Sequence, residues 1–224
     1  MDRKTAVIIG GTGAFGRRFA KQMSESHNVV LLVRDRNRVP AELAGMLTLE
    51  IDITRRETLE AAMAEVLRVH GGIDAVINAA GVVAFGEVSE TTTRMLLEVN
   101  TLGVLNVIAV ARAGLNAGGW LLSLSGVAAE MQIVGMGSYC ASKAGASAAM
   151  RTAARELRRA GVRVIDVRVG HCETGLVDRS LEGRAGAMPK GFDPDAVVER
   201  ILQLVETGVV DIGPESFENL PRAL

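Results

Sequence analysis

The chain is poor in cysteine, proline and aromatic residues, and it has almost no net charge. Its 224 residues include five prolines and two cysteines, and aromatic side chains make up 3%. Cys140 and Cys172 have neither the spacing of a metal site nor the number of a disulfide framework, which favours a reducing, cytoplasmic setting. With 25 basic and 26 acidic side chains, the chain is not expected to bind nucleic acid or a membrane surface.

Long apolar runs and a secretion signal are also missing. No apolar run has the length of a membrane span, and the N-terminus leads directly into an apolar strand. What is present is a hydrophobic content of 48%, rich in alanine, glycine and valine, which is enough for a sizeable core. We expect one domain over residues 1–224, because no internal boundary, repeat or low-complexity tract interrupts the pattern.

Short apolar runs alternate with segments of helical periodicity. The runs predict strands at residues 6–9, 28–33, 47–51, 73–77, 120–125, 162–169 and 209–212. Helices are predicted at residues 17–24, 55–69, 91–117 and 138–159, and a short one after Asp193-Pro194. This alternation predicts an α/β fold of the Rossmann type, a doubly wound parallel sheet of about seven strands with helices on both faces.

A glycine-rich turn joins the first strand to the first helix. Gly10, Gly13 and Gly16 form the pattern G-x-x-G-x-x-G, which differs slightly from the usual G-x-G-x-x-G. Glycines there allow a tight turn and a close approach to a pyrophosphate, and the helix directs its positive N-terminus at that charge. The strand before and the helix after favour a dinucleotide-binding turn over a turn without a ligand.

The end of the second strand is where the adenosine ribose of a dinucleotide lies. Arg34 stands there, followed by Arg36 and Arg38, and an arginine can accept the 2′-phosphate of NADP. Asp35, by contrast, could bind the ribose hydroxyls of NAD. We expect NADP as the cofactor, with NAD and a solvated charged turn as the alternatives.

Tyr139 and Lys143 lie four residues apart at the start of an alanine-rich helix, so they share one face. A free phenol loses its proton near pH ~10, and a neighbouring ammonium lowers that pKa. The pair suits general acid–base catalysis, although such pairs also occur on helices without a function. Asn100 lies inside another predicted helix, where asparagine is mildly unfavourable, and needs either a solvent-facing or a functional explanation.

Several motifs occur together in one order along the chain. They are the glycine turn, Asn78-Ala79-Ala80-Gly81, Asn100, Ser125 and Tyr139-x-x-x-Lys143. In this combination they resemble the short-chain dehydrogenase/reductase family over almost the whole length. The resemblance implies that Tyr139 is the general acid or base, that Lys143 holds the nicotinamide ribose, and that Asn100 holds a water in a proton relay.

The resemblance also implies a cofactor site and an assembly. The cofactor-binding residues would be Gly10, Thr12, Gly13, Phe15, Gly16, Arg34, Asp52, Ile53, Asn78, Ala79, Ala80, Gly81, Tyr139, Lys143, Gly170 and Thr174. No metal is expected, and the partner would be a small carbonyl or alcohol substrate. Family members commonly form dimers or tetramers through two long helices, here residues 91–117 and 138–160, so a homodimer or homotetramer is expected.

The sequence departs from the family pattern at the catalytic serine. The family usually carries that serine thirteen residues before the tyrosine, where this chain has Gly126. Ser125 precedes it, but adjacent strand residues point to opposite faces, so a shift of one residue in the loop would be needed to bring Ser125 into the site. Ser125 is therefore a candidate catalytic residue whose role stays open.

Residues 175–191 are expected to form a lid that selects the substrate. His171, just before this lid, is either a supplementary proton donor or a histidine that stabilises a loop. The expected function is NADP(H)-dependent interconversion of a carbonyl and an alcohol by hydride transfer, with Tyr139 as general acid or base. The alternatives are an epimerase or dehydratase on the same fold, and a non-catalytic NADP-binding regulatory protein, which Gly126 would favour.

Overall fold

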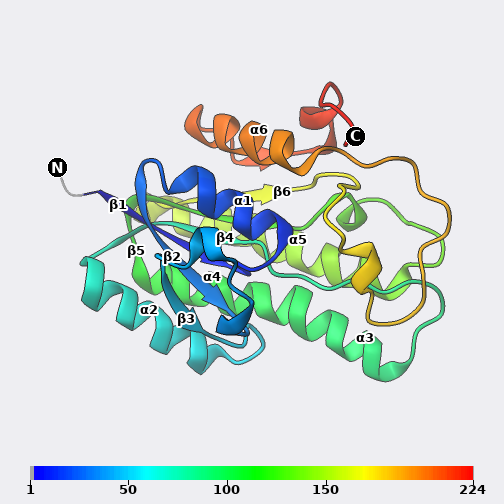
Figure 1. Cartoon of the computed structure of the whole chain (residues 1–224), viewed down its shortest axis with the longest axis horizontal. Helices are drawn as coiled ribbons and strands as arrows, with labels where there is room; N and C mark the ends of the chain where they lie inside the picture. The colour runs from blue at the N-terminus through cyan, green and yellow to red at the C-terminus, as the bar shows by residue number, and fades with distance from the viewer. Residues whose placement is uncertain (1–2, 224) are drawn as a thin grey trace.

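The computed structural model describes residues 3–223, and its centre is one parallel sheet (Figure 1). The strands are β1 (Lys4–Ile9), β2 (His27–Val33), β3 (Leu47–Glu50), β4 (Ile73–Asn78), β5 (Leu115–Leu124), β6 (Arg163–Val167) and β7 (Asp211–Ile212). Their order across the sheet is β3-β2-β1-β4-β5-β6-β7, and each neighbouring pair is parallel. The α/β fold predicted from the sequence is confirmed.

Helices cover both faces of this sheet. They are α1 (Ala14–Met23), α2 (Arg56–His70), α3 (Glu90–Leu97), α4 (Gly103–Gly114), α5 (Gly137–Leu157) and α6 (Pro194–Glu206). One apolar core lies between the sheet and α2, α4 and α5, and a second lies between the sheet and α1 and α6. β1 shows how one strand serves both, because Val7 and Ile9 belong to the first core and Ala6 and Ile8 to the second.

The differences from the predicted elements have local causes. α1 begins at Ala14 and not at residue 17, because the helix follows directly on the turn that ends at Gly13. α6 is longer than expected and is capped by Asp193, whose carboxylate accepts the N–H of Asp195 at 2.8 Å. The helix predicted over residues 91–117 is divided into α3, a π-helical turn (Glu98–Leu102) and α4, and the chain enters β5 at Leu115.

Residues Glu90–Gly114 form a helical stretch that is long and apolar enough to cross a membrane by length and composition. The sequence predicted no such segment. Half of the most apolar window, 50%, is buried inside the molecule, and buried core helices meet the same two criteria. Its apolar residues, such as Val104 and Val107, belong to the core between the sheet and α2, α4 and α5.

The strand order reverses between β1 and β4. The chain runs outward from β1 through β2 to β3 and then crosses to β4 on the other side of β1. Loops that leave the carboxyl ends of the strands diverge at such a reversal, and open α/β sheets bind their ligands in the crevice between them. The glycine turn follows β1 and residues 79–81 follow β4, so both motifs lie at this place.

Candidate active site

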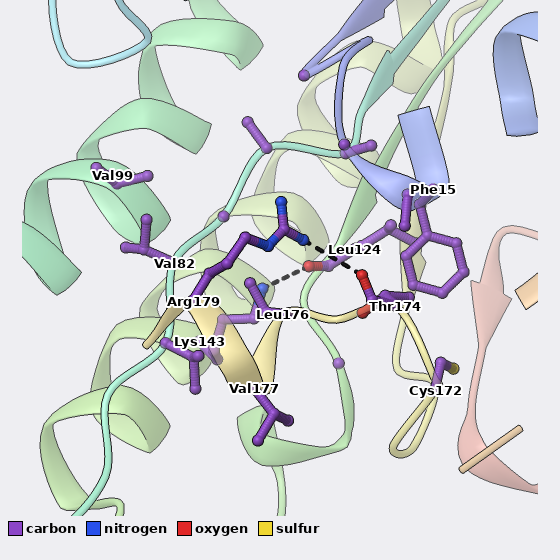
Figure 2. A pocket seen from close by; sticks show the side chains of 18 of the residues that line it. Phe15, Val82, Val99, Leu124, Lys143, Cys172, Thr174, Leu176, Val177 and Arg179 are labelled. Atoms are coloured by element: carbon purple, nitrogen blue, oxygen red, sulfur yellow. Dashed lines mark hydrogen bonds between the residues drawn. The ribbon is translucent and has the colours of Figure 1, made fainter. Parts of the chain in front are cut away.

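A cavity of about 410 Å³ lies at the carboxyl ends of the strands (Figure 2). Most of the predicted site residues line it: Gly10, Thr12, Gly13, Phe15, Arg34, Asp52, Ile53, Ala79, Ala80, Gly81, Tyr139, Lys143, Gly170 and Thr174. Four predicted site residues lie outside the lining, and they are Gly16, Asn78, Asn100 and Ser125. Each of these four makes contacts that explain its position.

The glycine turn packs backbone against backbone. Gly10 has a φ of +81°, and a Cβ there would lie 2.8 Å from the backbone nitrogen of Ala80. A Cβ at Gly16 would lie 2.1 Å from the carbonyl oxygen of Gly10, so Gly16 serves the packing of α1 on the turn. The first turn of α1 holds no acidic residue, and no side chain of residues 3–223 caps it. The positive end of this helix therefore faces the crevice without a counter-charge, which suits a phosphate group.

Asn78 stabilises the turn that follows β4. Its Nδ2 donates a 3.1 Å hydrogen bond to Ser123 Oγ on β5, and its Oδ1 accepts the N–H of Ala80 at 3.2 Å. The side chain is buried, with 1% of its surface exposed. Asn78 thus fixes the backbone of Ala79 and Ala80 at the cavity wall without lining the cavity itself.

The cavity carries more positive than negative charge. Arg34 and Arg38 line it after β2, and Lys143 and Arg179 line it on the side of α5 and the lid. Among the lining residues that the structure describes, Asp52 is the one acidic side chain. Thr54 donates to the Asp52 carboxylate from its side chain at 2.7 Å, and this bond holds the pKa of Asp52 below its usual value. A polyanionic ligand fits this distribution of charge.

Asp35 does not compete with Arg34 inside the cavity. Its carboxylate accepts the N–H of Asn37 at 2.9 Å and caps a short 3-10 helix (Arg36–Arg38). Arg34 and Arg38 line the cavity, whereas Asp35 and Arg36 do not. Asp35, which made the choice between NAD and NADP ambiguous in the sequence, therefore caps the turn and does not line the cavity.

Tyr139 and Lys143 lie on one face of α5, and the Lys143 Nζ is 6.0 Å from the centre of the Tyr139 ring. Nζ donates a 2.6 Å hydrogen bond to the carbonyl oxygen of Leu124, the last residue of β5 (Figure 2). Burial lowers the pKa of Lys143 to about 8. Burial also raises the pKa of Tyr139 to about 12. The predicted lowering of the Tyr139 pKa is not seen, because the cost of burying the phenolate dominates.

Asn100 lies in the π-helical turn and is buried, with 2% of its surface exposed. Its Nδ2 donates to the carbonyl oxygen of Val82 at 2.9 Å, and its Oδ1 accepts the N–H of Val82 at 3.0 Å. Nδ2 also donates to Ser142 Oγ at 3.0 Å. These bonds exclude the solvent-facing explanation and tie the cavity wall at Val82 to α5. Such π turns are common at functional sites, and this one was not predicted from the sequence.

Ser125 points away from the cavity. Its Oγ donates a 2.5 Å hydrogen bond to Asp166 on β6, and the residue is fully buried. Gly126 lines the cavity instead, with φ of +77° and ψ of 163°, a region open essentially to glycine alone. The loop has not shifted by one residue, so Ser125 lies outside the cavity lining, and the shift that a catalytic role would need is not found.

The lid, residues 175–191, lies against the segment that follows β4. Leu181 donates its N–H to the carbonyl oxygen of Val83 at 2.8 Å, and Phe85 donates its N–H to that of Glu182 at 3.0 Å. The lid contributes Leu176, Val177, Arg179 and Met188 to the cavity lining. The substrate end of the cavity is therefore largely apolar, with one cation.

That cation, Arg179, was not predicted. Its Nε donates to the carbonyl oxygen of Gly175 at 2.9 Å and its Nη2 to that of Thr174 at 3.3 Å. Figure 2 shows its side chain reaching from the lid across the cavity toward Thr174 and Phe15. Two backbone carbonyls orient the guanidinium and leave other N–H donors for a ligand. The feature of the sequence that could have identified Arg179 is that it is a cation within the predicted lid, close in sequence to Thr174.

His171 lines the cavity, and its Nε2 lies 3.2 Å from the Glu173 carboxylate. Glu173 also accepts the N–H of Gly191 at 2.7 Å, so the pair connects the two ends of the lid. This geometry supports the loop-stabilising interpretation. Among residues 3–223, no group of three or more histidine, cysteine or acidic side chains could hold a metal ion.

Comparisons with known proteins agree with this geometry. A family model described as short chain dehydrogenase matches residues 4–185. Carbonyl reductase family member 4 of Danio rerio is 27% identical over 217 residues, covering 91% of this chain and 92% of the relative. A short chain dehydrogenase of Burkholderia cenocepacia, solved with NADP, has a TM-score of 0.82 at 24% identity, covering 97% and 91% of the two chains. One from Burkholderia phymatum, solved with NAD, has a TM-score of 0.81 at 23% identity, covering 94% and 88%.

Proposed function

The chain belongs to the short-chain dehydrogenase family, and from this premise we propose that it is an NADP(H)-dependent oxidoreductase that interconverts a carbonyl and an alcohol. One observation carries the proposal: Tyr139 and Lys143 line the same cavity as the glycine turn, next to an apolar pocket. A proton donor, a cation and a dinucleotide cradle are thereby brought together in one site.

The residues present fit a dinucleotide. Gly10 and Gly13 leave room for a diphosphate where side chains would fill the turn, and the positive end of α1 faces it. Thr174 and Arg179 would hold the opposite side of the diphosphate. Asp52 and Ile53 would flank the adenine, since both line the far end of the cavity after β3.

NADP fits better than NAD. Arg34 and Arg38 line the cavity after β2, where the adenosine ribose of a dinucleotide lies, and would pair with a 2′-phosphate. Asp35, the residue that could instead bind ribose hydroxyls, is engaged in its own turn. NAD stays the alternative cofactor. Its ribose has no 2′-phosphate, so Arg34 and Arg38 would remain in contact with solvent when NAD is bound.

When bound, NADP(H) supplies or accepts the hydride, and the protein provides position and the proton. In reduction the Tyr139 hydroxyl donates its proton to the substrate oxygen, and in oxidation Tyr139 takes it back. Lys143 would hold the nicotinamide ribose and, with Nζ 6.0 Å from the centre of the Tyr139 ring, would stabilise the phenolate that Tyr139 becomes. Burial raises the pKa of Tyr139 to about 12, so the hydroxyl carries at neutral pH the proton that reduction requires.

Asn100 and Gly126 define the rest of the mechanism. Asn100 keeps Val82 and Ser142 in place and would hold the relay water that returns a proton to Lys143. Because residue 126 is a glycine, no serine at this position donates a hydrogen bond to the substrate oxygen. The Tyr139 hydroxyl must therefore polarise the substrate carbonyl. Loss of such a donor lowers the rate by roughly a hundredfold or more in other enzymes. We therefore expect a reactive substrate, such as an aldehyde or quinone, in the apolar pocket.

The non-catalytic alternative has Gly126 in its favour and the retained Tyr139–Lys143 pair against it.

A homo-oligomer through α4 and α5 is proposed on a further observation. Leu105 is 46% exposed, and it lines a shallow groove of the two helices with Ile108, Ala148, Ala149 and other residues, among them the ion-paired Arg112 and Glu156. A second copy would cover this groove, as the helical packing of small residues allows. A cytoplasmic location stays a prediction.

Oxidation of NADPH, and separately of NADH, over a panel of aldehydes, ketones and quinones tests the proposed function. We expect turnover with NADPH that Tyr139→Phe abolishes, while NADPH binding persists because the ring is kept. Turnover that survives in the variant would contradict the assigned proton donor. NADPH binding without turnover on the whole panel would support the regulatory alternative.

A further inference from the structure

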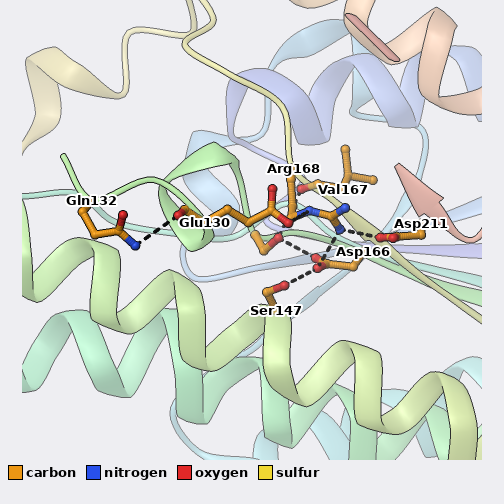
Figure 3. A network of polar contacts seen from close by, with 8 residues as sticks. Glu130, Gln132, Ser147, Asp166, Val167, Arg168 and Asp211 are labelled. Carbon is orange, nitrogen blue, oxygen red and sulfur yellow. Dashed lines mark hydrogen bonds and ion pairs between the residues drawn. The ribbon is translucent and has the colours of Figure 1, made fainter. Parts of the chain in front are cut away.

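β6 carries a buried carboxylate that the proposed reaction does not use. Asp166 is 3% exposed and accepts hydrogen bonds from Ser125 Oγ at 2.5 Å, Ser147 Oγ at 2.5 Å and Arg168 Nη1 at 3.3 Å (Figure 3). A buried carboxylate destabilises a fold unless cations and hydrogen bonds balance it. The charge on Asp166 beside a catalytic cavity therefore requires a physical explanation.

Arg168 does not balance Asp166 alone. Its guanidinium lies among three carboxylates, with Glu130 at 2.7 Å, Asp211 at 2.5 Å and Asp166 at 3.3 Å. Glu130 comes from the loop after β5 and Asp211 from β7 (Figure 3). Because one arginine is shared by three acids and Asp166 is the most distant, Asp166 keeps negative charge for a second cation.

Lys143 is placed to be that cation. Ser147, one helical turn after Lys143 on α5, donates to Asp166 Oδ2. Lys143 Nζ donates to the carbonyl oxygen of Leu124, and the next residue, Ser125, donates to Asp166 Oδ1. The Asp166 carboxylate and the Lys143 ammonium thus both have hydrogen-bond contacts at the end of β5, and both are linked to α5. The negative charge of Asp166 opposes the effect of burial on the Lys143 pKa.

We propose that Asp166 is a positioning residue that acts through Lys143 and keeps it charged beside Tyr139 and the site of the nicotinamide ribose. This inference deepens the proposed function and rests on it for the role of Lys143. The other groups near Lys143 are the Tyr139 ring, the uncharged Asn100, which borders Gly81 together with Lys143 Nζ, and Arg168 beyond Asp166. Glu130 and Asp211 face Arg168 and are partly exposed.

The ionisation of Lys143 can be measured without cofactor or turnover. The chain has only four lysines, Lys4, Lys21, Lys143 and Lys190, so protein labelled with ¹³C at lysine Cε gives few NMR signals. Lys143→Arg identifies the signal of Lys143. A pH titration of wild type, Asp166→Asn and Asp211→Asn then reports the lysine pKa, with Asp211 as the matched carboxylate that also contacts Arg168.

We expect Asp166→Asn to lower the Lys143 pKa by about one pH unit and Asp211→Asn to leave it unchanged. Removing a nearby negative charge disfavours the ammonium, so the alkaline limit of turnover should move to lower pH in Asp166→Asn alone. An unmoved Lys143 signal in folded Asp166→Asn, or an equal shift in Asp211→Asn, would overturn the proposal. A lack of turnover would affect the proposed function and not this titration.

Asp166→Asn leaves Arg168 with fewer partners and could weaken folding. The double variant Asp166→Asn/Arg168→Met removes both buried charges and leaves Glu130 and Asp211 to solvent. Loss of the Arg168 cation alone would raise the Lys143 pKa, so a lower pKa in the double variant can come only from the lost carboxylate. Arg168→Met alone is the reference, and a Lys143 pKa in the folded double variant that is not lower than in Arg168→Met contradicts the proposal.

Discussion

The hydroxyl of Ser125 donates a 2.5 Å hydrogen bond to the carboxylate of Asp166, inside the sheet and away from the cavity. The serine beside the family's catalytic position is therefore part of the polar network around Asp166 and Arg168. Its neighbour Gly126 lines the cavity without a side chain.

Ser125→Ala should leave turnover within a few-fold of wild type, because the side chain does not reach the cavity. The free energy of unfolding should fall by about 1–3 kcal/mol, since the variant removes a donor from a buried carboxylate. Urea unfolding and NADPH-dependent turnover of the same preparation check both parts. A hundredfold loss of turnover at unchanged stability would show that Ser125 is a catalytic donor after all.

Arg34→Gln should weaken NADPH binding at least about tenfold and leave NADH binding nearly unchanged. A charge-assisted bond to the 2′-phosphate is lost, and NADH has no such group. Titration calorimetry with both nucleotides measures the two dissociation constants. Arg36→Gln is the control, because Arg36 is an exposed neighbour that does not line the cavity. Equal weakening of both nucleotides in Arg34→Gln would exclude Arg34 as the 2′-phosphate ligand.

Arg179→Gln should weaken NADPH and NADH about equally, by about tenfold, because the diphosphate is common to both. Arg184→Gln is the matched control, since Arg184 is exposed in the same lid and does not line the cavity. Equilibrium binding of both nucleotides to the three proteins checks this prediction. Unchanged nucleotide binding with a raised KM for substrate would instead assign Arg179 to the substrate.

The fold could be predicted from the sequence because its signals are local. The central strands are short apolar runs buried on both faces, as with Ile8 and Ile9 of β1, and the glycine turn and the Tyr139–Lys143 pair depend on spacing within one element. The missing serine at Gly126 was also visible.

What escaped prediction depends on contacts between distant elements. Burial, and not the nearby Lys143, sets the Tyr139 pKa, and burial is a property of the whole site. The lid pairs with the distant segment at Val83 and Phe85, so Arg179 could not be placed from its neighbours in sequence. The partners of Ser125 and Asn100 lie on β6, on α5 and after β4.

Gly126→Ser, which would restore the serine of the family pattern, should not increase turnover. Space is available, because a Cβ at Gly126 would lie 3.7 Å from the carbonyl oxygen of Val169 and 3.8 Å from Lys143 Cε. The backbone is the obstacle, since a φ of +77° is strained for any residue with a Cβ.

The strain at Gly126→Ser should lower the free energy of unfolding by about 1–3 kcal/mol. Gly186→Ala is the control, because a Cβ at Gly186 meets no heavy atom within 4 Å and its φ lies outside the left-handed region. Thermal unfolding and turnover of both variants measure the two effects. A Gly126→Ser protein of wild-type stability and higher turnover would mean that the loop can adopt the ordinary family conformation, and that the missing donor alone limits the rate.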